Sequence, residues 1–302
     1  MRAQLLIKIR RFFELRNVME VETPLLSSST VTDPHIDAFS LDAGGGSELF
    51  LQTSPEYMMK RLLAGGSGAI FQICKAFRQG EHGASHNIEF TMLEWYRPNF
   101  NYHELMTEVE QFVLALLGPL PSRKLTYRQL FVQYLGIDPY LSDIVEMQAL
   151  AEANLELSFA HADRDTWLEL LFSQLIEPKL VGEGMTFVYD YPATQAALAK
   201  VAVDESGSEV GQRFELYLGD MELANGYFEL DDATEQLRRF NADNEQRVAM
   251  GKLERPVDNK LIAAIKHGLP ECSGVALGLD RLLMILADAS KIDKVLSFTP
   301  EG

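Results

Sequence analysis

Two strand-like segments joined by a polar loop constrain the fold of this chain more than any other feature. Residues 69–77 and 88–97 are rich in aromatic and aliphatic residues, whereas residues 79–87 between them are polar and contain glycine. This order is typical of a long antiparallel hairpin. On the second strand Glu94 and Tyr96 are two residues apart, so both side chains point to one face. The hairpin therefore predicts a sheet that carries an acidic group on one face.

Further helices and strands alternate along the chain. Apolar residues at helical spacing predict an amphipathic helix over residues 3–17, and the pattern of residues 101–182 is helical. We expect one α+β domain over residues 1–302, in which helices flank an antiparallel sheet and residues 101–182 form a helical insertion. The other expected strands are 18–22, 49–53, 186–189, 213–218 and 221–224, and the other expected helices are 55–63, 234–251, 258–268 and the second part of 272–288.

Composition restricts the partners and the compartment. The net charge is −17, from 44 acidic and 27 basic residues. This charge disfavours a nucleic-acid partner, because phosphate contacts need a basic surface. Cys74 and Cys272 lack the spacing of a metal site, which predicts free thiols in a reducing compartment. No apolar run approaches the ~20 residues that cross a membrane. We expect a cytoplasmic protein with no membrane partner.

Basic and aromatic residues at the hairpin loop form the first candidate site. Arg78 follows the first strand, and His86 and Asn87 lie where the loop returns. A guanidinium at a strand end can fork onto a phosphate or a carboxylate. Phe90, on the return strand, offers a ring on which a base can stack. These residue types together indicate a site for an anionic ligand that carries a ring.

A glycine-rich strand near the other end of the chain forms a second candidate. Residues 273–283 (SGVALGLDRLL) run from this strand into a helix that carries Arg281. Glycines let a ligand approach the backbone closely, although close packing of a helix on a sheet explains them about equally well. This segment indicates a binding site only in combination with the hairpin.

Together with residues 18–25 (VMEVETPL), these two segments resemble motifs 1, 2 and 3 of the class II aminoacyl-tRNA synthetases. The motifs would span about residues 3–25, 70–97 and 272–288. Within that class, the stretches SPEYMMKRLL, FR…HNIEFTMLEWY and ELANGYFEL are similar to the lysine enzymes. The resemblance covers about residues 3–298, which is nearly the whole chain.

Two details of the resemblance separate this chain from the lysyl-tRNA synthetases. Those enzymes carry an anticodon-binding barrel ahead of motif 1, whereas motif 1 begins here near the first residue, so we expect no anticodon-binding domain. The stretches WYRP and CSGVALGLDR resemble a truncated branch, the elongation factor P lysine ligase family. That family transfers β-lysine to a lysine side chain of elongation factor P. The resemblance implies ATP and Mg²⁺ as cofactors, lysine or β-lysine as the substrate, and elongation factor P as the acceptor, with tRNA disfavoured.

The resemblance also implies roles for individual residues. Arg78 and Arg281 would be catalytic, and Arg78 would hold the α-phosphate and the amino-acid carboxylate while they react. Glu215 and Glu222 would bind Mg²⁺, a hard ion whose shell the phosphates complete. The residues implied for ATP binding are Arg78, Gln79, Gly80, His86, Asn87, Phe90, Glu222, Leu223, Gly278 and Arg281.

Three carboxylates, those of Glu56, Glu94 and Glu229, characterise the implied substrate pocket. Buried negative charges are costly unless cations pair with them. A substrate with two ammonium groups, together with Mg²⁺, would meet this need, which favours a diamino acid over a neutral one. The residues implied for the pocket are Ser54, Pro55, Glu56, Glu94, Tyr96, Asn225, Glu229 and Ala276.

The chain departs from the synthetase pattern at two positions. Gly80 stands where motif 2 has a glutamate, and Glu81 follows it. Either Glu81 takes that role through a shift of the loop, or backbone atoms contact the ATP amino group. In motif 3, Ala276 stands where the synthetases have glycine. Our hypothesis is that this methyl group disfavours α-lysine and suits the displaced amino group of β-lysine.

Two other functions remain open at this point. A minimal lysyl-tRNA synthetase would charge tRNA through its acceptor stem, which the acidic charge and Ala276 disfavour. A non-catalytic, synthetase-like subunit would bind an amino acid for regulation, but such relatives tend to lose arginines and carboxylates that this chain keeps. Class II domains usually dimerise through motif 1, so residues 3–24 predict a homodimer interface. The alternative is that this helix only packs on its own core.

Overall fold

The computed structural model describes residues 1–157, 163–182 and 184–299. The chain forms two compact units, one from Met1–Asn101 with Glu229–Gly302 and one from Tyr102–Phe228. The expected insertion, residues 101–182, begins where the second unit begins, but this unit continues to Phe228. Residues 158–162 of that insertion lie outside the described residues. A single domain over residues 1–302 stays a prediction.

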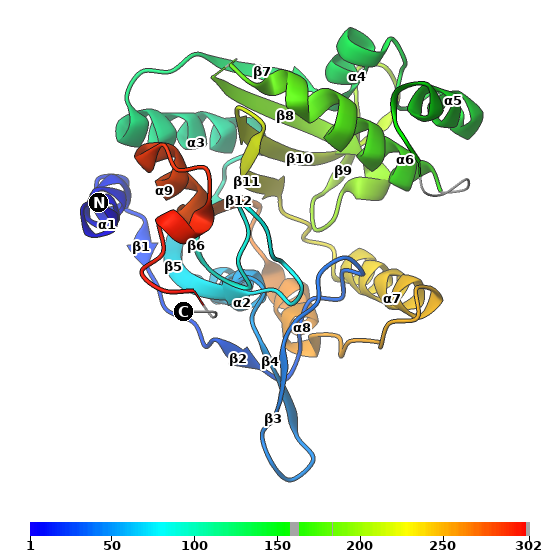
Figure 1. Ribbon diagram of the computed structural model, residues 1–302. Coiled ribbons are helices and arrows are strands. Elements are labelled where there is room, and N and C mark those ends of the chain that lie inside the picture. Colours follow the sequence, from blue (N-terminus) through cyan, green and yellow to red (C-terminus); the bar gives the residue numbers. More distant parts are fainter. Residues whose placement is uncertain (158–162, 183, 300–302) are drawn as a thin grey trace. The chain divides into compact units, whose positions relative to one another are not determined.

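The main sheet of the first unit is built around the predicted hairpin (Figure 1). β5 (Ile70–Phe77) and β6 (Glu89–Pro98) pair in antiparallel register, and β12 (Cys272–Gly278) pairs with the other edge of β6, also antiparallel. β1 (Met19–Glu20) joins β5 in parallel register, so the expectation of an antiparallel sheet is confirmed only for the long strands. β2 (Leu26–Ser27), β4 (Glu48–Leu51) and β3 (Ser40–Asp42) form a separate small antiparallel sheet.

The amphipathic N-terminal helix is confirmed as α1 (Arg2–Glu14). Its buried residues Leu5, Ile9, Phe12 and Phe13 recur at the spacing of one helix face. Phe13 stacks on Phe71 of β5, with ring centroids 4.4 Å apart. The other helices of this unit are α2 (Glu56–Ala64), α7 (Ala233–Ala249), α8 (Asn259–Gly268) and α9 (Leu279–Ala287), followed by the short turn η4 (Ile292–Lys294).

The strands of the second unit are arranged around a hairpin of β10 (Glu209–Leu218) and β11 (Met221–Phe228). β8 (Met185–Pro192) and β9 (Val201–Val203) both pair with β10 in antiparallel register. β7 (Ser122–Thr126) pairs with β8 in parallel register. β7 corrects the expectation of a purely helical stretch, because its sequence SRKLT has little apolar pattern and the pairing with the buried strand β8 determines its conformation.

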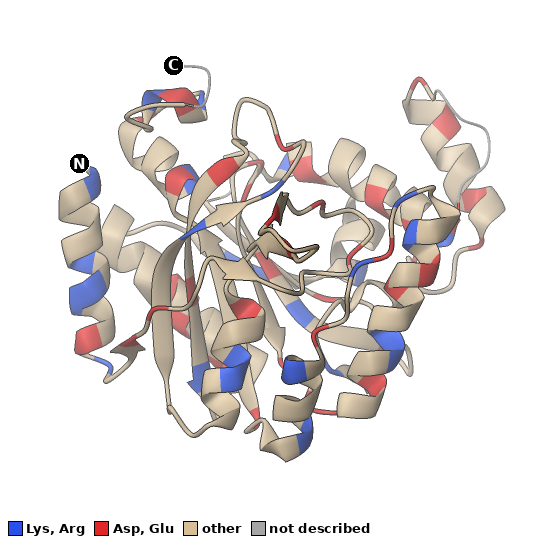
Figure 2. Cartoon of the chain, turned by 90° about the horizontal axis from the view of Figure 1, so that it is seen from below, with Lys and Arg blue, Asp and Glu red and all other residues tan. Residues whose placement is uncertain are grey.

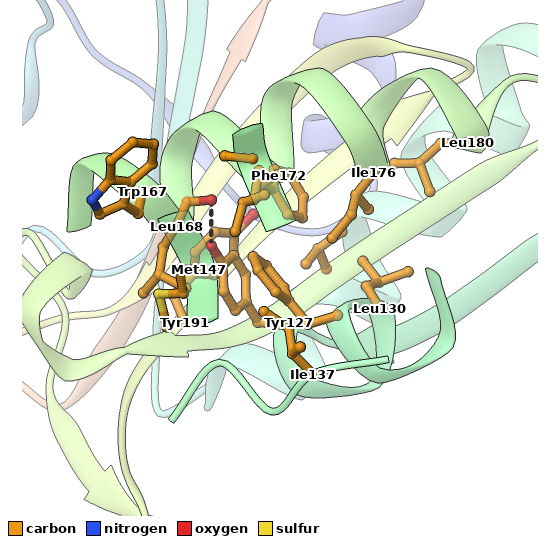
Figure 3. Packing of buried hydrophobic residues seen from close by; sticks show 14 of the residues in the cluster. Tyr127, Leu130, Ile137, Met147, Trp167, Leu168, Phe172, Ile176, Leu180 and Tyr191 are labelled. Carbon is orange, nitrogen blue, oxygen red and sulfur yellow. Dashed lines mark hydrogen bonds between the residues drawn. The ribbon is translucent and has the colours of Figure 1, made fainter. Parts of the chain in front are cut away.

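Helices of the second unit pack around a core of aromatic and aliphatic residues (Figure 3). Tyr127 stacks on Phe172 at 5.2 Å between ring centroids, and its hydroxyl donates to the carbonyl of Leu168. The helical elements are α3 (Tyr102–Leu117), α4 (Tyr127–Leu135), α5 (Ile144–Asn154), α6 (Arg164–Leu171), η1 (Phe172–Ile176), η2 (Glu177–Leu180) and η3 (Ala193–Gln195). Among the described residues of both units, no helix is both long and apolar enough to cross a membrane.

Candidate active site

Arg78 is placed at the end of β5 by the hairpin itself. Its backbone N–H donates to the carbonyl of Ile88, which closes the loop at 3.0 Å. The guanidinium lies 5.2 Å from the centre of the Phe90 ring, and its Nη1 is 3.3 Å from Oε1 of Glu81. Its Nε donates to the carbonyl of Thr53 at 3.4 Å. The structure thus brings together two residues that the sequence assigned to ATP, with the cation above the ring.

The loop explains why glycine stands at the position of the motif 2 glutamate. Gly80 has a φ of +84°, a left-handed conformation that residues with a side chain rarely adopt. The preceding residue, Gln79, donates its N–H to the carbonyl of Asp37 at 2.7 Å, which holds the loop in place. The carboxylate therefore comes from Glu81, which pairs with Arg78. A contact between Glu81 and ATP stays a prediction.

Arg281 meets the same loop from the first turn of α9. Its Nη2 lies 2.5 Å from Nε2 of His86, and its Nε donates to the carbonyl of Ser85 at 3.5 Å. Burial, and next the positive charge of Arg281, lower the pKa of His86, which favours its neutral imidazole. Asn87 donates to the carbonyl of Glu89 at 2.6 Å and fixes the return of the loop. Arg78, His86 and Arg281, the basic cluster, suit a polyphosphate.

The predicted acidic pocket also forms in the first unit. Glu94 and Glu229 are 2% and 1% exposed, and the Tyr96 hydroxyl donates to Oε1 of Glu94 at 2.8 Å. Oε2 of Glu94 is buried and has no hydrogen-bond partner. Burial, and next the charge of Glu56, raise the pKa of Glu94 well above its usual range. The pocket thus contains the Glu94 carboxylate, whose Oε2 can accept a hydrogen bond from a ligand.

A buried lysine that sequence reasoning missed completes this pocket. Nζ of Lys60 lies 2.6 Å from Oε1 of Glu56 and 2.6 Å from Oε2 of Glu229, and the lysine side chain is 1% exposed. Burial by itself lowers the pKa of Lys60, but the two carboxylates outweigh it and raise that pKa. For Glu229, burial is the main cause of a pKa raised to about 7. The spacing of four residues between Glu56 and Lys60 on a predicted helix was the signal that could have found this pair.

The register of β5, β6 and β12 sets the floor of the pocket. Glu94 stands directly between Gln72 on one side and Ala276 on the other, and opposed residues share a face. Two residues earlier on β12, Gly274 stands opposite Tyr96. A Cβ atom at Gly274 would lie 2.3 Å from Cε1 of Tyr96 and 2.5 Å from Oε1 of Glu229. Glycine is therefore required at 274, whereas Ala276 adds its methyl group beside Glu94.

The remaining site residues of the first unit lie at two helix starts. Pro55 precedes α2, and the Ser54 hydroxyl accepts from the N–H of Glu56 at 3.3 Å. Ser54 and Glu56 line a pocket together with Thr30 and other residues of the loop before β3. Gly278 precedes α9, where a Cβ atom would lie 3.5 Å from Cδ of Arg281. These positions agree with roles in substrate and ATP binding, which stay predictions.

The residues implied for Mg²⁺ lie in the second unit, on the β10–β11 hairpin. Glu215 is buried, accepts from the hydroxyls of Tyr191 and Tyr217 at 2.6 Å each, and pairs with Arg213. Glu222 stands opposite Tyr217, next to a β-bulge. In the part of the chain that the structure describes, no group of three or more His, Cys, Asp or Glu side chains is placed to hold a metal. Two carboxylates fit Mg²⁺ only if phosphates and water complete its shell, which is its usual mode.

Two further predicted residues lie on the same hairpin. Asn225 of β11 stands opposite Glu215, and Leu223 is buried at 1% exposure. Close by, burial is the main cause that raises the pKa of Glu177 to about 7, and the charges of Glu215 and Glu222 add to it. The charges of these three carboxylates therefore act on one another.

Comparison with known proteins agrees with this geometry. A family described as tRNA synthetases class II (D, K and N) matches residues 1–301. The elongation factor P--(R)-beta-lysine ligase of Pseudoalteromonas translucida (strain TAC 125) is 50% identical over 304 residues, which cover 98% of this chain and 93% of that protein. The proteins of the same name from Vibrio cholerae serotype O1 and Sodalis glossinidius (strain morsitans) are 50% and 47% identical, over 98% and 99% of this chain and 93% and 94% of their own. The chain therefore belongs to the class II tRNA synthetase family and, within it, to the family of the elongation factor P--(R)-beta-lysine ligases.

Proposed function

We propose that this protein is a ligase that uses ATP to activate β-lysine or lysine and transfers it to a lysine side chain of elongation factor P. The observation that carries this proposal is the acidic pocket formed by Glu56, Glu94 and Glu229 in the unit that also holds the basic cluster. A diamino acid has two ammonium groups for the pocket and a carboxylate for a guanidinium. The names of the relatives supply the acceptor.

The first step of the proposed reaction forms an aminoacyl-adenylate. The amino-acid carboxylate oxygen attacks the α-phosphorus of ATP, the bond to the bridging oxygen of the β-phosphate breaks, and pyrophosphate leaves. Arg78 holds the α-phosphate and the attacking carboxylate, while Arg281 and neutral His86 bind the phosphates and the base side. Glu215 and Glu222 would be the protein ligands of Mg²⁺, and the ion would supply positive charge for phosphate oxygens.

The second step transfers the aminoacyl group. The neutral ε-amine of the acceptor lysine attacks the carbonyl carbon of the mixed anhydride, an amide bond forms, and AMP leaves with the carbon–oxygen bond broken. The nitrogen that forms the amide releases one proton to solvent in this step. The residues of this chain contribute positioning and charge stabilisation rather than a covalent intermediate. We place this reaction in the cytoplasm, in agreement with the free thiols of Cys74 and Cys272.

Pyrophosphate exchange and product analysis test this function. The wild-type protein should exchange labelled pyrophosphate into ATP with (R)-β-lysine or α-lysine, and elongation factor P should gain the mass of one lysyl group. A parallel assay measures aminoacylation of tRNA. Exchange that leads only to charged tRNA would identify a minimal synthetase, and no exchange with either isomer would favour a regulatory amino-acid-binding subunit.

The hypothesis that the methyl group of Ala276 disfavours α-lysine can be tested by substitution. Ala276 stands opposite Glu94 on the floor of the acidic pocket. Its methyl group therefore limits the space in which a substrate ammonium can approach this carboxylate. Ala276→Gly should lower the KM for α-lysine relative to that for (R)-β-lysine by about tenfold, since a change of one methyl group in a pocket is worth ~1–3 kcal/mol. Pyrophosphate exchange with each isomer measures the ratio, and an unchanged ratio would contradict the hypothesis.

We also propose a homodimer that forms through α1 and β1. Ile7, Leu15 and Met19 are exposed at 67%, 64% and 51%, although other residues of α1 pack on the core of their own unit. Lys8, Arg10 and Arg11 of the same helix are exposed as well, and Figure 2 shows basic residues along it, so both apolar and cationic groups of α1 are exposed. A two-fold contact between two such helices would cover these apolar side chains.

A further inference from the structure

Lys60 contributes a positive charge to the acidic pocket. Its ammonium lies 2.6 Å from carboxylate oxygens of both Glu56 and Glu229 and is almost completely removed from water. Glu94 adjoins the same cluster, because its hydrogen-bond partner Tyr96 and Glu229 both lie within 2.5 Å of the position that a Cβ atom at Gly274 would take. Lys60 therefore neutralises one of the three carboxylates, and two negative charges remain when all three are ionised.

The two remaining negative charges match the two ammonium groups of the amino acid in the proposed reaction. Lysine and β-lysine each carry two ammonium groups, and their carboxylate is directed to the basic cluster in the proposed mechanism. Without Lys60, the pocket would need three cations, and a buried unpaired carboxylate is costly. Oε2 of Glu94, which is buried and lacks a partner, offers an acceptor for one of the two incoming ammonium groups.

We infer that Lys60 is a built-in counter-ion of the acidic pocket, a positioning residue that stays between Glu56 and Glu229 when the diamino acid binds and so sets the charge of the ligand that the pocket accepts. This inference rests on the proposed function. The alternative is a placeholder, in which the substrate ammonium displaces Lys60 from one of its carboxylates. A second alternative is a purely structural filler, whose volume matters and whose charge does not.

Lys60→Met tests the charge, because methionine retains the length of the chain and lacks the ammonium group. We expect the KM for the preferred lysine isomer to rise at least about tenfold in pyrophosphate exchange, while the KM for ATP stays within about twofold. Lys75→Met is the matched control, because Lys75 pairs with Glu89 at 3.1 Å but is 42% exposed. The control should leave both KM values within about twofold, as exposed pairs contribute little. An unchanged amino-acid KM in folded Lys60→Met would overturn the inference.

Chemical rescue separates charge from volume. Lys60→Ala removes a fragment of the size of n-propylammonium. Added n-propylammonium should lower the raised amino-acid KM by at least about fivefold, whereas n-propanol of similar size should not. Equal rescue by both compounds would identify Lys60 as a filler. Wild-type protein that shows no exchange with either isomer would instead refute the proposed function itself.

A measurement on the wild-type protein covers the case in which neither variant folds. Acetylation of lysines by acetic anhydride, read by mass spectrometry, reports which amines are exposed and deprotonated. Lys60 should stay among the least modified lysines both without and with a saturating lysine isomer. A rise of its acetylation on ligand binding would show displacement, and that result would overturn the role as a retained counter-ion.

Discussion

At the residue scale, the acidic pocket shows which part of a site a sequence reveals. Glu94 and Tyr96 were predicted to share a face because side chains alternate along a strand, and their hydrogen bond confirms it. Lys60 was not predicted, because a lysine in a helix is usually solvated and only the fold buries it between two acids. The local spacing predicts the contact with Glu56. The contact with Glu229 depends on a segment far away in the chain.

The raised pKa values in the pocket predict how substrate affinity depends on pH. Glu229, with a pKa of about 7, and Glu94, whose pKa is also raised, must be ionised to pair with ammonium groups. As the pH falls through that range, protons compete with the substrate, so its KM rises. We expect an increase of about tenfold between about pH 8 and about pH 6 for one such carboxylate. Pyrophosphate exchange over this range measures it, and an amino-acid KM that is independent of pH would contradict the assignment.

At the scale of elements, local pattern predicted the long strands and helices but not all of their pairings. The hairpin of β5 and β6 and the helix α1 agree with the pattern of apolar residues. Two pairs of strands are parallel, β1 with β5 and β7 with β8. The shorter strand of each pair, β1 or β7, has little apolar pattern of its own. Such segments become strands because a neighbouring strand offers hydrogen-bond partners, and that information is not local.

The strand β12 makes a testable contribution to stability. Gly274→Ala would place a Cβ atom within 2.5 Å of both Tyr96 and Glu229, so these groups must move. We expect the free energy of unfolding to fall by ~1–3 kcal/mol, the usual effect of overpacking. Urea denaturation measures it. Gly278→Ala is the control, because its Cβ would approach no atom closer than 3.5 Å, and its unfolding free energy should change by less than ~0.5 kcal/mol. Equal effects of the two changes would argue against this crowding.

At the scale of the whole molecule, the sequence indicated the class II architecture, and the family match over residues 1–301 confirms it. The division into two compact units was not predicted. The reason is that the second unit combines helices with strands whose pattern resembles that of the first unit, so composition marks no boundary. No stretch rich in proline, glycine or serine separates the two parts at residues 101 and 229.

The proposed homodimer gives a prediction at this scale. Wild-type protein should sediment as a dimer at micromolar concentration, and Ile7→Lys should shift it toward the monomer by adding a charge to the exposed face of α1. Because Ile7 is 67% exposed, this change should alter the free energy of unfolding of the protomer by less than ~0.5 kcal/mol. Analytical ultracentrifugation of both proteins gives the result. A wild-type protein that sediments as a monomer would refute the interface.

The first unit is built from two stretches of chain that are separated by the whole of the second unit. During synthesis on the ribosome, Glu56, Glu94 and Lys60 are therefore made well before Glu229 and Gly274. At ~5–20 residues per second, this interval is on the order of ten seconds. During this interval only one of the two final partners of Lys60 has been synthesised, namely Glu56, which lies one helical turn away on α2. The acidic pocket is thus among the last parts of the protein to be completed as the chain emerges.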